Sequence, residues 1–544
     1  MDDKRITVKT VSSMEKIMPC TEPSELEKEN VMLSNERFHF QIALKNNSAG
    51  MLRRLSVRIT GIDERYLTVR TVELVPGGYF LPENDDYYIT HEPGLFPDLL
   101  RPISKKGIVI PRMQWCSLFV TVHSEKGIPA GRYNLKIQIL NVETVMSECE
   151  YVLEVRPERL PDTDLRLTNW MHYDCIAYQH KVEPFSDGFY AIFEKYLREY
   201  TLCGNNMLLT PLFTPPLDTE VGGERETAQL IDVEKTGDGY VFSFEKLKKF
   251  ISFVTGRGIK YIEFNHLFTQ WGGAFCPKIM AHTDKGYEKI FGWETKSDSE
   301  EYRAFLDAFL PELMKVTDEL GVTEKCYFHL TDEPHTDHME AYKKCHKAVK
   351  KHIGDRPIMD AISNYDFYEK GLIDIPVPQT SSYPSFKERN TSDFMIYYCC
   401  VPCDKYYSNR ALSMPLQRTR IIGLQLYESG ARGFLHWGFN FYNTASSYEP
   451  IDPYADTAAG GMFPSGDSFI VYPAENDVLS TLRAECIGEA FQDYRLCRLV
   501  EAGIGGAGVR EILHSFGVEG YNTYPRSVSA HKEIRKKLID TLNG

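Results

Sequence analysis

The chain has 544 residues, with 62 Lys and Arg against 76 Asp and Glu, and a formal net charge of −14 at pH 7. Hydrophobic residues make up 42% and charged residues 25%, an ordinary globular balance that excludes a disordered or fibrous chain. The acidic balance argues against a nucleic-acid-binding protein, because affinity for phosphates depends on clustered Lys and Arg. The length predicts two to four domains, or one large barrel with an appended domain.

Residues 1–20 are polar and charged and show no apolar signal-peptide segment. No stretch of the sequence approaches the roughly 18 consecutive apolar residues of a membrane span. The 13 cysteines are scattered without a disulfide framework, as expected for reduced thiols. These features predict a cytoplasmic protein that has no membrane partner.

Residues 1–158 have strand character. Six runs alternate between apolar and polar residues or are rich in β-branched residues, and Gly, Pro, Asn and Asp clusters separate them. These runs are Phe38–Leu44, Leu55–Ile59, Leu67–Leu74, Trp115–Val122, Gly131–Ile139 and Glu150–Val155. Two prolines within residues 156–161 end the pattern, so we predict an N-terminal antiparallel β-sandwich over residues 1–158.

From about residue 165 the pattern changes to alternating strands and helices. The predicted strands are Leu165–His172, Met207–Leu212, Lys260–Asn265, Cys326–Leu330, Pro357–Ile362, Ile375–Ser381, Phe394–Cys400 and Gly433–Phe439. Amphipathic helices are predicted at Gly188–Leu202, Phe244–Thr255, Glu300–Leu320, Met339–His352 and Leu416–Ser429. Eight such strands favour a (β/α)8 barrel of the TIM type over residues 159–505. An open doubly wound sheet is the alternative, but no Gly-rich phosphate turn follows the first strand.

The region after residue 476 is expected to be helical, with helices at Leu479–Val500 and His531–Leu542. Residues 506–544 are predicted to form a C-terminal helical extension. The predicted architecture is therefore multidomain, with a β-sandwich, an α/β barrel and C-terminal helices.

The segment 327–335, at the end of the fourth predicted barrel strand, carries the strongest chemical signal. Active-site residues of such barrels gather at the C-terminal ends of the strands. Asp332 and Glu333 can face one pocket only if the strand has already broken, because adjacent residues of a strand point to opposite faces. Two coupled carboxylates raise at least one pKa and supply a proton donor near neutral pH. The alternative is that Asp332 caps the following helix and Glu333 is solvated.

The sequence Thr331-Asp-Glu-Pro334 resembles the catalytic signature of glycoside hydrolase family 123. Other segments resemble this family in order and spacing over residues 30–500, namely Pro97–Leu100, Trp115–Tyr133, Asn205–Leu212, Gly433–Asn440, Gly466–Asp467, Val471–Pro473, Ser480–Glu485 and Gln492–Tyr494. Characterised members of the family are β-N-acetylgalactosaminidases that retain configuration by substrate-assisted catalysis. The resemblance implies that Glu333 is the general acid/base. It also implies that Asp332 orients the 2-acetamido group of the substrate, whose carbonyl oxygen attacks the anomeric carbon to form an oxazolinium-like intermediate.

Seven further residues at strand ends and in loops are candidates for binding the sugar, namely Trp437, Asn440, Tyr442, Tyr383, His172, Asn265 and Asp467. A strand-end indole such as Trp437 either floors a sugar subsite or packs in the barrel. Asp467 either binds sugar hydroxyls or closes its own loop by an Asx turn. The cluster of His329, Asp332, His335 and His338 matches no established zinc spacing, so we predict no metal and no cofactor.

Together these features predict a glycoside hydrolase that cleaves terminal β-linked N-acetylhexosamine, with N-acetylgalactosamine favoured, from a glycan or oligosaccharide. Two alternatives stay open. One is a glycosidase of another sugar that uses two enzyme carboxylates, and the other is an inactive carbohydrate-binding protein. The sequence does not specify the oligomeric state or the aglycone.

Overall fold

The computed structural model describes residues 5–80, 85–237, 239–389, 391–398 and 406–542. Contacts within the chain define two compact units. Residues 1–163, 404–428 and 479–544 form the first, which we name the sandwich unit, and residues 164–403 and 429–478 form the second, the α/β unit. This grouping differs from linear boundaries at residues 158 and 505, because helices from the later part of the chain pack with the N-terminal strands.

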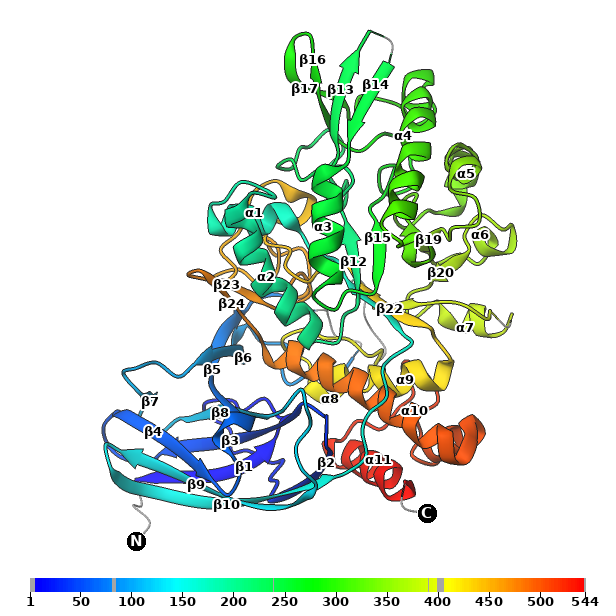
Figure 1. The fold of residues 1–544 in the computed structure, drawn as a ribbon. Helices are drawn as coiled ribbons and strands as arrows, with labels where there is room; N and C mark the ends of the chain where they lie inside the picture. Colours follow the sequence, from blue (N-terminus) through cyan, green and yellow to red (C-terminus); the bar gives the residue numbers. More distant parts are fainter. Residues whose placement is uncertain (1–4, 81–84, 238, 390, 399–405, 543–544) are drawn as a thin grey trace. The chain divides into compact units, whose positions relative to one another are not determined.

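The sandwich unit contains two five-stranded sheets, with strand orders β1-β3-β8-β5-β6 and β2-β10-β9-β4-β7 (blue to cyan in Figure 1). Their bounds are β1 Ile6–Ser12, β2 Glu29–Leu33, β3 Phe38–Asn46, β4 Leu52–Thr60, β5 Leu67–Gly77, β6 Gly94–Pro102, β7 Ile108–Ile110, β8 Trp115–Val122, β9 Gly131–Asn141 and β10 Thr144–Arg156. The six predicted strands are all present, whereas β1, β2, β6 and β7 were not predicted. Side chains from both sheets, such as Ile42 of β3 and Ile137 of β9, share one hydrophobic core, as a sandwich requires.

Three helices of the sandwich unit are α8 (Leu416–Arg420), α10 (Leu482–Ser515) and α11 (Val528–Thr541). A hydrophobic cluster joins them to the first sheet through residues that include Phe119, Leu416, Leu482 and Val528. Helix α10 is kinked at Gly505, whose φ of +75° is accessible to glycine without strain. Burial of this apolar cluster explains why the late helices belong to the same unit as the strands.

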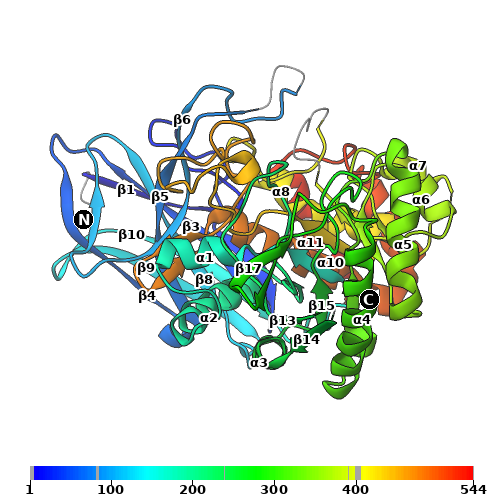
Figure 2. The ribbon, with the colours of Figure 1, turned by 90° about the horizontal axis from the view of Figure 1, so that it is seen from above.

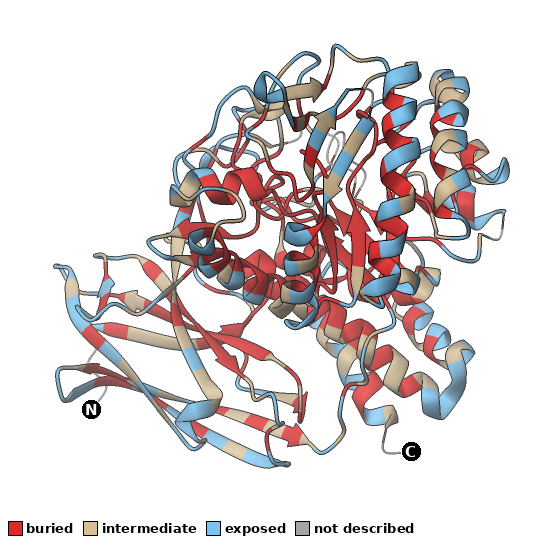
Figure 3. Ribbon diagram, turned by 45° about the horizontal axis from the view of Figure 1, so that its top comes forward, coloured by how far each residue is buried: buried red, intermediate tan, exposed pale blue. Residues whose placement is uncertain are grey.

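All eight strands predicted for the second region occur in the α/β unit, with shorter bounds. They are β11 Arg166–Asn169, β12 Met207–Thr210, β15 Tyr261–Phe264, β18 Cys326–Phe328, β19 Met359–Ala361, β20 Ile375–Val377, β21 Ile396–Tyr397 and β22 Gly433–His436. Residues 399 and 400 of the predicted strand Phe394–Cys400 lie outside the described residues. In Figure 3 the strands at the centre of this unit are buried along their length, while the surrounding helices carry exposed outer faces.

These strands pair in parallel in three groups, β11-β22-β21, β12-β15-β18 and β19-β20. Single parallel bridges, Phe328 with Ile358 and Gln379 with Tyr397, extend the pairing between groups. Next to β11 and β12, the side chain of Asn206 accepts a hydrogen bond from the Leu167 amide (3.0 Å). A closed (β/α)8 barrel stays a prediction, because the described ladders do not join into one continuous ring.

Helices of the α/β unit are α1 Tyr173–His180, α2 Asp187–Leu202, α3 Glu245–Thr255, α4 Glu300–Glu319, α5 Met339–Ile353, α6 Asp366–Glu369 and α7 Tyr383–Lys387, and α9 spans Ile422–Ser429 where the two units meet in sequence. Helices α4 and α5 lie side by side (Figure 2). Short 3-10 helices occur at Glu64–Tyr66, Thr323–Lys325, Thr336–His338 and Ala445–Ser447. Among the described helices, none is both long and apolar enough to cross a lipid bilayer.

An additional four-stranded sheet in the α/β unit was not predicted from the sequence. Its strand order is β14-β13-β16-β17, with bounds Gly239–Ser243, Asp232–Thr236, Ile279–Thr283 and Gly286–Phe291. The hairpins lie between consecutive strands of the main pattern, where the expected βα rhythm is interrupted. A short pair, β23 (Tyr472–Ala474) and β24 (Asp477–Leu479), follows β22.

Candidate active site

Asp332 and Glu333 lie four and five residues beyond the end of β18 and line one pocket. Glu333 has a φ of +44°, a left-handed conformation that is uncommon outside glycine and costs free energy unless the surroundings hold it. The Trp271 amide donates a hydrogen bond to the Asp332 carbonyl oxygen (2.9 Å). The next helical turn begins at Thr336 and has His335 as its N-cap, so Asp332 does not cap it. The strand has therefore broken before the pair, as a shared pocket requires.

The carboxyl groups of the pair differ in environment. Burial and the neighbouring charge of Glu333 raise the pKa of Asp332 well above its ordinary value, and the charge of His329 opposes that shift. Glu333 is exposed to the pocket, and its Oε1 accepts a hydrogen bond from the Tyr397 hydroxyl (2.6 Å). Tyr397, at the end of β21, was not identified from the sequence. The pair therefore retains a proton at higher pH than an isolated aspartate would.

Much of the remaining pocket wall is aromatic, and it includes one further carboxylate. The aromatic side chains are Trp170, Trp271, Tyr397, Tyr398, Trp437 and Phe463, and the carboxylate is Asp218. Trp271 is 50% exposed. Trp271 and Asp218 lie in loops that follow the third and second predicted strands. The strand-end rule points to these loops, but no local pattern singles out the individual residues.

Trp437 lines the pocket and Asp467 lies behind it. The indole Nε1–H of Trp437 donates to Oδ2 of Asp467 (2.9 Å), and the ring packs against Phe463 with centroids 4.9 Å apart. The second carboxylate oxygen of Asp467 lies 3.3 Å from Nε2 of His436. Asp467 is buried, so in this geometry its carboxylate holds the indole in place.

His172 also lines the pocket, and its ring orientation is determined by its neighbours. Its Nδ1 lies 3.2 Å from the Arg225 guanidinium, which only donates, so Nδ1 accepts and Nε2–H donates to the Trp437 carbonyl (2.9 Å). Burial and the Arg225 charge lower the pKa of His172 to about 4, so the ring is neutral. Asp174 binds Arg225 through two hydrogen bonds of 2.6 and 2.8 Å. Asn440 lies behind His172, where its amide bonds the His172 backbone at both ends (2.9 and 3.0 Å).

Five of the seven predicted sugar-binding residues do not line the pocket. Asn440 and Asp467 lie behind His172 and Trp437, and the other three are Asn265, Tyr442 and Tyr383. The side chains of these three bond backbone groups of neighbouring segments, Asn265 with Leu212 (2.8 Å), Tyr442 with Val471 (2.9 Å) and Tyr383 with Ser429 (3.2 Å). All three side chains are buried. Polar side chains at strand ends tie loops together as readily as they bind ligands, and sequence position alone does not distinguish the two uses.

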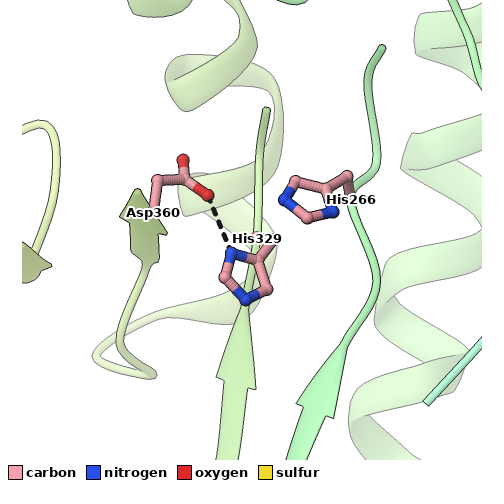
Figure 4. Close-up of side chains that lie close together, drawn as sticks. All are labelled: His266, His329 and Asp360. Atoms are coloured by element: carbon pink, nitrogen blue, oxygen red, sulfur yellow. Dashed lines mark hydrogen bonds and ion pairs between the residues drawn. The ribbon is translucent and has the colours of Figure 1, made fainter. Parts of the chain in front are cut away.

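A fully buried hydrogen-bond network lies next to the pocket. His329 is held between Glu263 (2.6 Å, Nε2 to Oε1) and Asp360 (3.0 Å, Nδ1 to Oδ1), and Figure 4 shows the second of these bonds. Burial disfavours the charged imidazole, but the hydrogen bonds to Asp360 and Glu263 raise the pKa of His329 to about 9. The pocket residue Trp170 donates its indole N–H to Glu263 (2.6 Å). His329 is therefore an imidazolium, connected to the pocket wall through Glu263.

His266, His329 and Asp360 present nitrogen and oxygen atoms within 4.8 Å of one another, which raises the question of a metal ion. The rings of His266 and His329 stack with centroids 4.4 Å apart and planes inclined by 25°, so their in-plane lone pairs do not converge on one point (Figure 4). Both nitrogens of His329 are already bonded to carboxylates. His329 and Asp360 therefore fit a charged hydrogen-bond network better than a metal centre, and His266 stacks on His329 with no hydrogen-bond partner for its ring nitrogens among the described residues.

Comparison with known proteins places this pocket in context. The chain matches the family model "Glycoside hydrolase 123, catalytic domain" over residues 170–500. It is similar to the structure of a family 123 glycoside hydrolase from Clostridium perfringens, described for glycolipid glycan hydrolysis, with a TM-score of 0.74, 15% identity and coverage of 99% of this chain and 97% of that chain. At that identity the likeness shows a shared fold.

A family 39 glycoside hydrolase from the gut symbiont Bacteroides cellulosilyticus WH2 is more distant, with a TM-score of 0.35, 13% identity and coverage of 88% of this chain and 82% of that chain. No curated protein matches the sequence. The family model extends over more than half of the chain and contains Asp332, Glu333 and the other residues of the pocket. The chain therefore belongs to glycoside hydrolase family 123 and is a glycoside hydrolase.

Proposed function

We propose that this enzyme cleaves terminal β-linked N-acetylhexosamine, with N-acetylgalactosamine favoured, by a retaining, substrate-assisted mechanism. The observation that carries the proposal is the adjacency of Asp332 and Glu333 in one pocket. A retaining enzyme that supplies its own nucleophile places two carboxyl groups about 5–5.5 Å apart, flanking the scissile bond. Two neighbours on one short segment approach the sugar from the same side, and we infer that the attacking group comes from the substrate.

Each carboxyl group then has a distinct role. Glu333 protonates the glycosidic oxygen and later deprotonates the attacking water, and the Tyr397 hydroxyl holds its carboxyl group in place. Asp332 accepts the N–H of the 2-acetamido group, whose carbonyl oxygen attacks the anomeric carbon and expels the aglycone. Burial and the charge of Glu333 raise the pKa of Asp332. Accepting the acetamido N–H favours the ionised form of Asp332.

The test is Glu333→Gln, assayed on aryl N-acetyl-β-hexosaminides and on the matching 2-hydroxy glycosides. Loss of a general acid lowers turnover by about 10²–10⁴-fold, while the fold and binding of the sugar are retained. Glu340→Gln, an exposed glutamate on α5, is the matched control. Wild-type enzyme is expected to bind a thiazoline analogue of the acetamido sugar tightly. Unchanged turnover in Glu333→Gln refutes the role assigned to Glu333.

One alternative has a specific observation in its favour. Asp218 is a third carboxylate in the pocket and is the candidate nucleophile for a glycosidase that acts on another sugar with two enzyme carboxylates. Such an enzyme hydrolyses 2-hydroxy glycosides and does not bind the thiazoline tightly. The Clostridium perfringens relative is described for glycolipid glycans, so glycolipid-derived oligosaccharides belong in the natural-substrate screen.

A further inference from the structure

We propose that Asp218 is a sugar-binding residue, whose carboxylate accepts a hydrogen bond from a ring hydroxyl on the part of the terminal sugar that Asp332 and Glu333 do not hold. The proposal extends the proposed function, because it assigns the remaining hydroxyls of the same sugar. Its chemical basis is an ionised acceptor that lines the pocket with one oxygen lacking a donor. Four observations support it.

The first observation is the position of Asp218. It lies in the segment after β12 and lines the same pocket as Asp332 and Glu333. Its backbone is held on both sides, since its amide donates to Oε1 of Gln270 (2.6 Å) and its carbonyl oxygen accepts from the Ser447 hydroxyl (2.7 Å). The neighbours therefore place this residue through its main chain, and the Ser446 backbone amide also acts on its carboxylate.

The second observation is the backbone conformation. Asp218 has a φ of +44°, in the left-handed region that is uncommon for residues other than glycine. Glu333 shows the same feature in the same pocket. Strained residues of this kind persist where the surroundings over-determine them and are concentrated at functional sites.

The third observation is an unpaired acceptor. Oδ2 of Asp218 is shielded from solvent and has no hydrogen-bond partner among the described residues. The nearby Arg225 guanidinium directs two hydrogen bonds to Asp174 instead. Leaving a buried acceptor unpaired is costly, more so when it is charged. A ligand hydroxyl reaching into the pocket would supply the missing donor.

The fourth observation concerns charge. Burial raises the pKa of Asp218 to about 6, against the opposing effects of the Ser446 backbone amide and the Arg225 charge. The carboxylate is therefore mostly ionised at neutral pH and acts as an acceptor. The other titratable or charged groups around it are Asp332 and Glu333 after β18, Arg225 in its own loop and His172 at the start of α1, which is neutral above pH 4. A neutral hydroxyl of the sugar can donate to this carboxylate, and the charges around the carboxylate do not require the ligand to be charged.

The proposed mechanism limits which hydroxyl is bound. Glu333 acts at carbon 1 and Asp332 at the acetamido group on carbon 2, which leaves the hydroxyls of carbons 3, 4 and 6. N-acetylgalactosamine and N-acetylglucosamine differ only in the orientation of the hydroxyl on carbon 4. If Asp218 binds that hydroxyl, it also determines which of the two sugars is preferred.

The experiment is a double-mutant cycle between Asp218→Asn and substrate deoxygenation. The substrates are an aryl N-acetyl-β-hexosaminide and its 3-, 4- and 6-deoxy analogues. Asp218→Asn is expected to lower kcat/KM on the parent substrate by about 10- to 100-fold, the effect of losing a hydrogen bond to a charged group. Removing the hydroxyl that Asp218 contacts is expected to lower kcat/KM of the wild type by a similar factor and that of the variant much less. Removing either of the other two hydroxyls should lower kcat/KM of both enzymes by the same factor. Ionisation of Asp218 also contributes an inflection near pH 6 to the wild-type profile of kcat/KM, and the variant lacks this inflection while it keeps the acidic limb that follows Asp332.

Asp284→Asn makes the same chemical change on an exposed turn between β16 and β17 and serves as the matched control, with unchanged kcat/KM. Asp218→Ser is a second variant with the same expected coupling, and far-UV circular dichroism reports whether each variant is folded. If no deoxygenation couples to either variant, Asp218 does not bind the sugar and the proposal is wrong. If Asp218→Ala abolishes turnover and added azide restores it by forming a glycosyl azide as the phenol leaves, Asp218 is the nucleophile and both proposals fall.

Failure of the proposed function is recognised separately. If the wild-type enzyme binds the thiazoline poorly but Asp218→Asn couples clearly to removal of one hydroxyl, the role of Asp218 is supported and the substrate-assisted mechanism is refuted. Tight thiazoline binding without coupling supports the substrate-assisted mechanism and refutes the role of Asp218.

Discussion

Glu485 and Asp493 in the sandwich unit and Asp332 and Asp218 in the α/β unit have opposite electrostatic environments. In the sandwich unit, Glu485 is only 5% exposed and forms ion pairs with Arg37 (3.0 Å) and Arg70 (2.7 Å). Burial alone would raise the pKa of Glu485, but the charges of Arg37, Arg70 and His39 bring it well below its usual range. The pKa of Asp493 is likewise lowered by arginines on two other helices.

In the α/β unit, Asp332 and Asp218 have no arginine bound to their carboxylates among the described residues. Burial raises the pKa of both, and for Asp332 the charge of Glu333 adds to the shift. The same residue types thus have opposite pKa shifts because of the charge of their neighbours. A paired buried acid holds helices to strands, whereas an unpaired one is available to move a proton or bind a hydroxyl.

The largest expected effect is the loss of stability on removing the charge of Glu485, which is paired with two arginines. Glu485→Gln leaves two arginines without their partner and is expected to destabilise the protein by about 3–5 kcal/mol. Urea denaturation at pH 7.5 measures this cost. Glu143→Gln, which loses only an exposed pair with Arg58, is the control and should cost less than about 1 kcal/mol. Because the folded pKa of Glu485 is lowered, its stabilisation is present above the unfolded pKa of about 4.3 and is lost as the pH falls further.

Replacing Asp332, which has no arginine partner among the described residues, by its amide should have the opposite effect on stability. Asp332→Asn is expected to raise Tm at pH 7.5 by roughly 1–4 °C while lowering kcat by about 10²–10³-fold. The folded pKa of Asp332 is raised, so its penalty is present at neutral pH and absent below the unfolded pKa of about 3.9. Wild type and variant should therefore have equal Tm near pH 3.5. A lower Tm for Asp332→Asn at pH 7.5 contradicts the comparison.

A third prediction removes the cation whose charge acts on Asp332. His329→Gln deletes the imidazolium whose charge opposes the raised pKa of Asp332. That pKa should then rise further, and the acidic limb of kcat/KM should move to higher pH, with on the order of tenfold lower activity at its acidic end. His282→Gln, exposed on β16, is the control. A loss of activity that is uniform with pH assigns His329 a structural role only.

The smallest effect is expected at the wall of the pocket. Asp467→Ala leaves the Trp437 indole N–H without its acceptor and is expected to raise KM by about 3- to 10-fold with little change in kcat. Asp467→Asn keeps an acceptor oxygen and should restore KM. Equal KM values for the two variants imply that Asp467 acts through its charge on His436 rather than through Trp437.

Much of the fold could be predicted locally. The six long sandwich strands and the eight buried strands of the α/β unit correspond to apolar or alternating runs, because burial of a strand imposes that pattern wherever it occurs. Strands β13, β14, β16 and β17 were missed because they interrupt the expected βα rhythm, and their partly exposed faces give a weak apolar pattern. The helices α6 and α7 have only four and five residues, too few for a periodic signal.

The sequence by itself located Asp332 and Glu333, because a strand end followed by proline is a local feature of the chain. It also indicated which loops surround the pair. Only the tertiary structure decided that Tyr397 bonds Glu333, that Asp467 holds Trp437, and that Asp218 joins the pocket while Asn265, Tyr442 and Tyr383 do not. These relations join segments up to hundreds of residues apart, and they depend on the three-dimensional position and charge of each neighbour, which residue type and spacing do not encode.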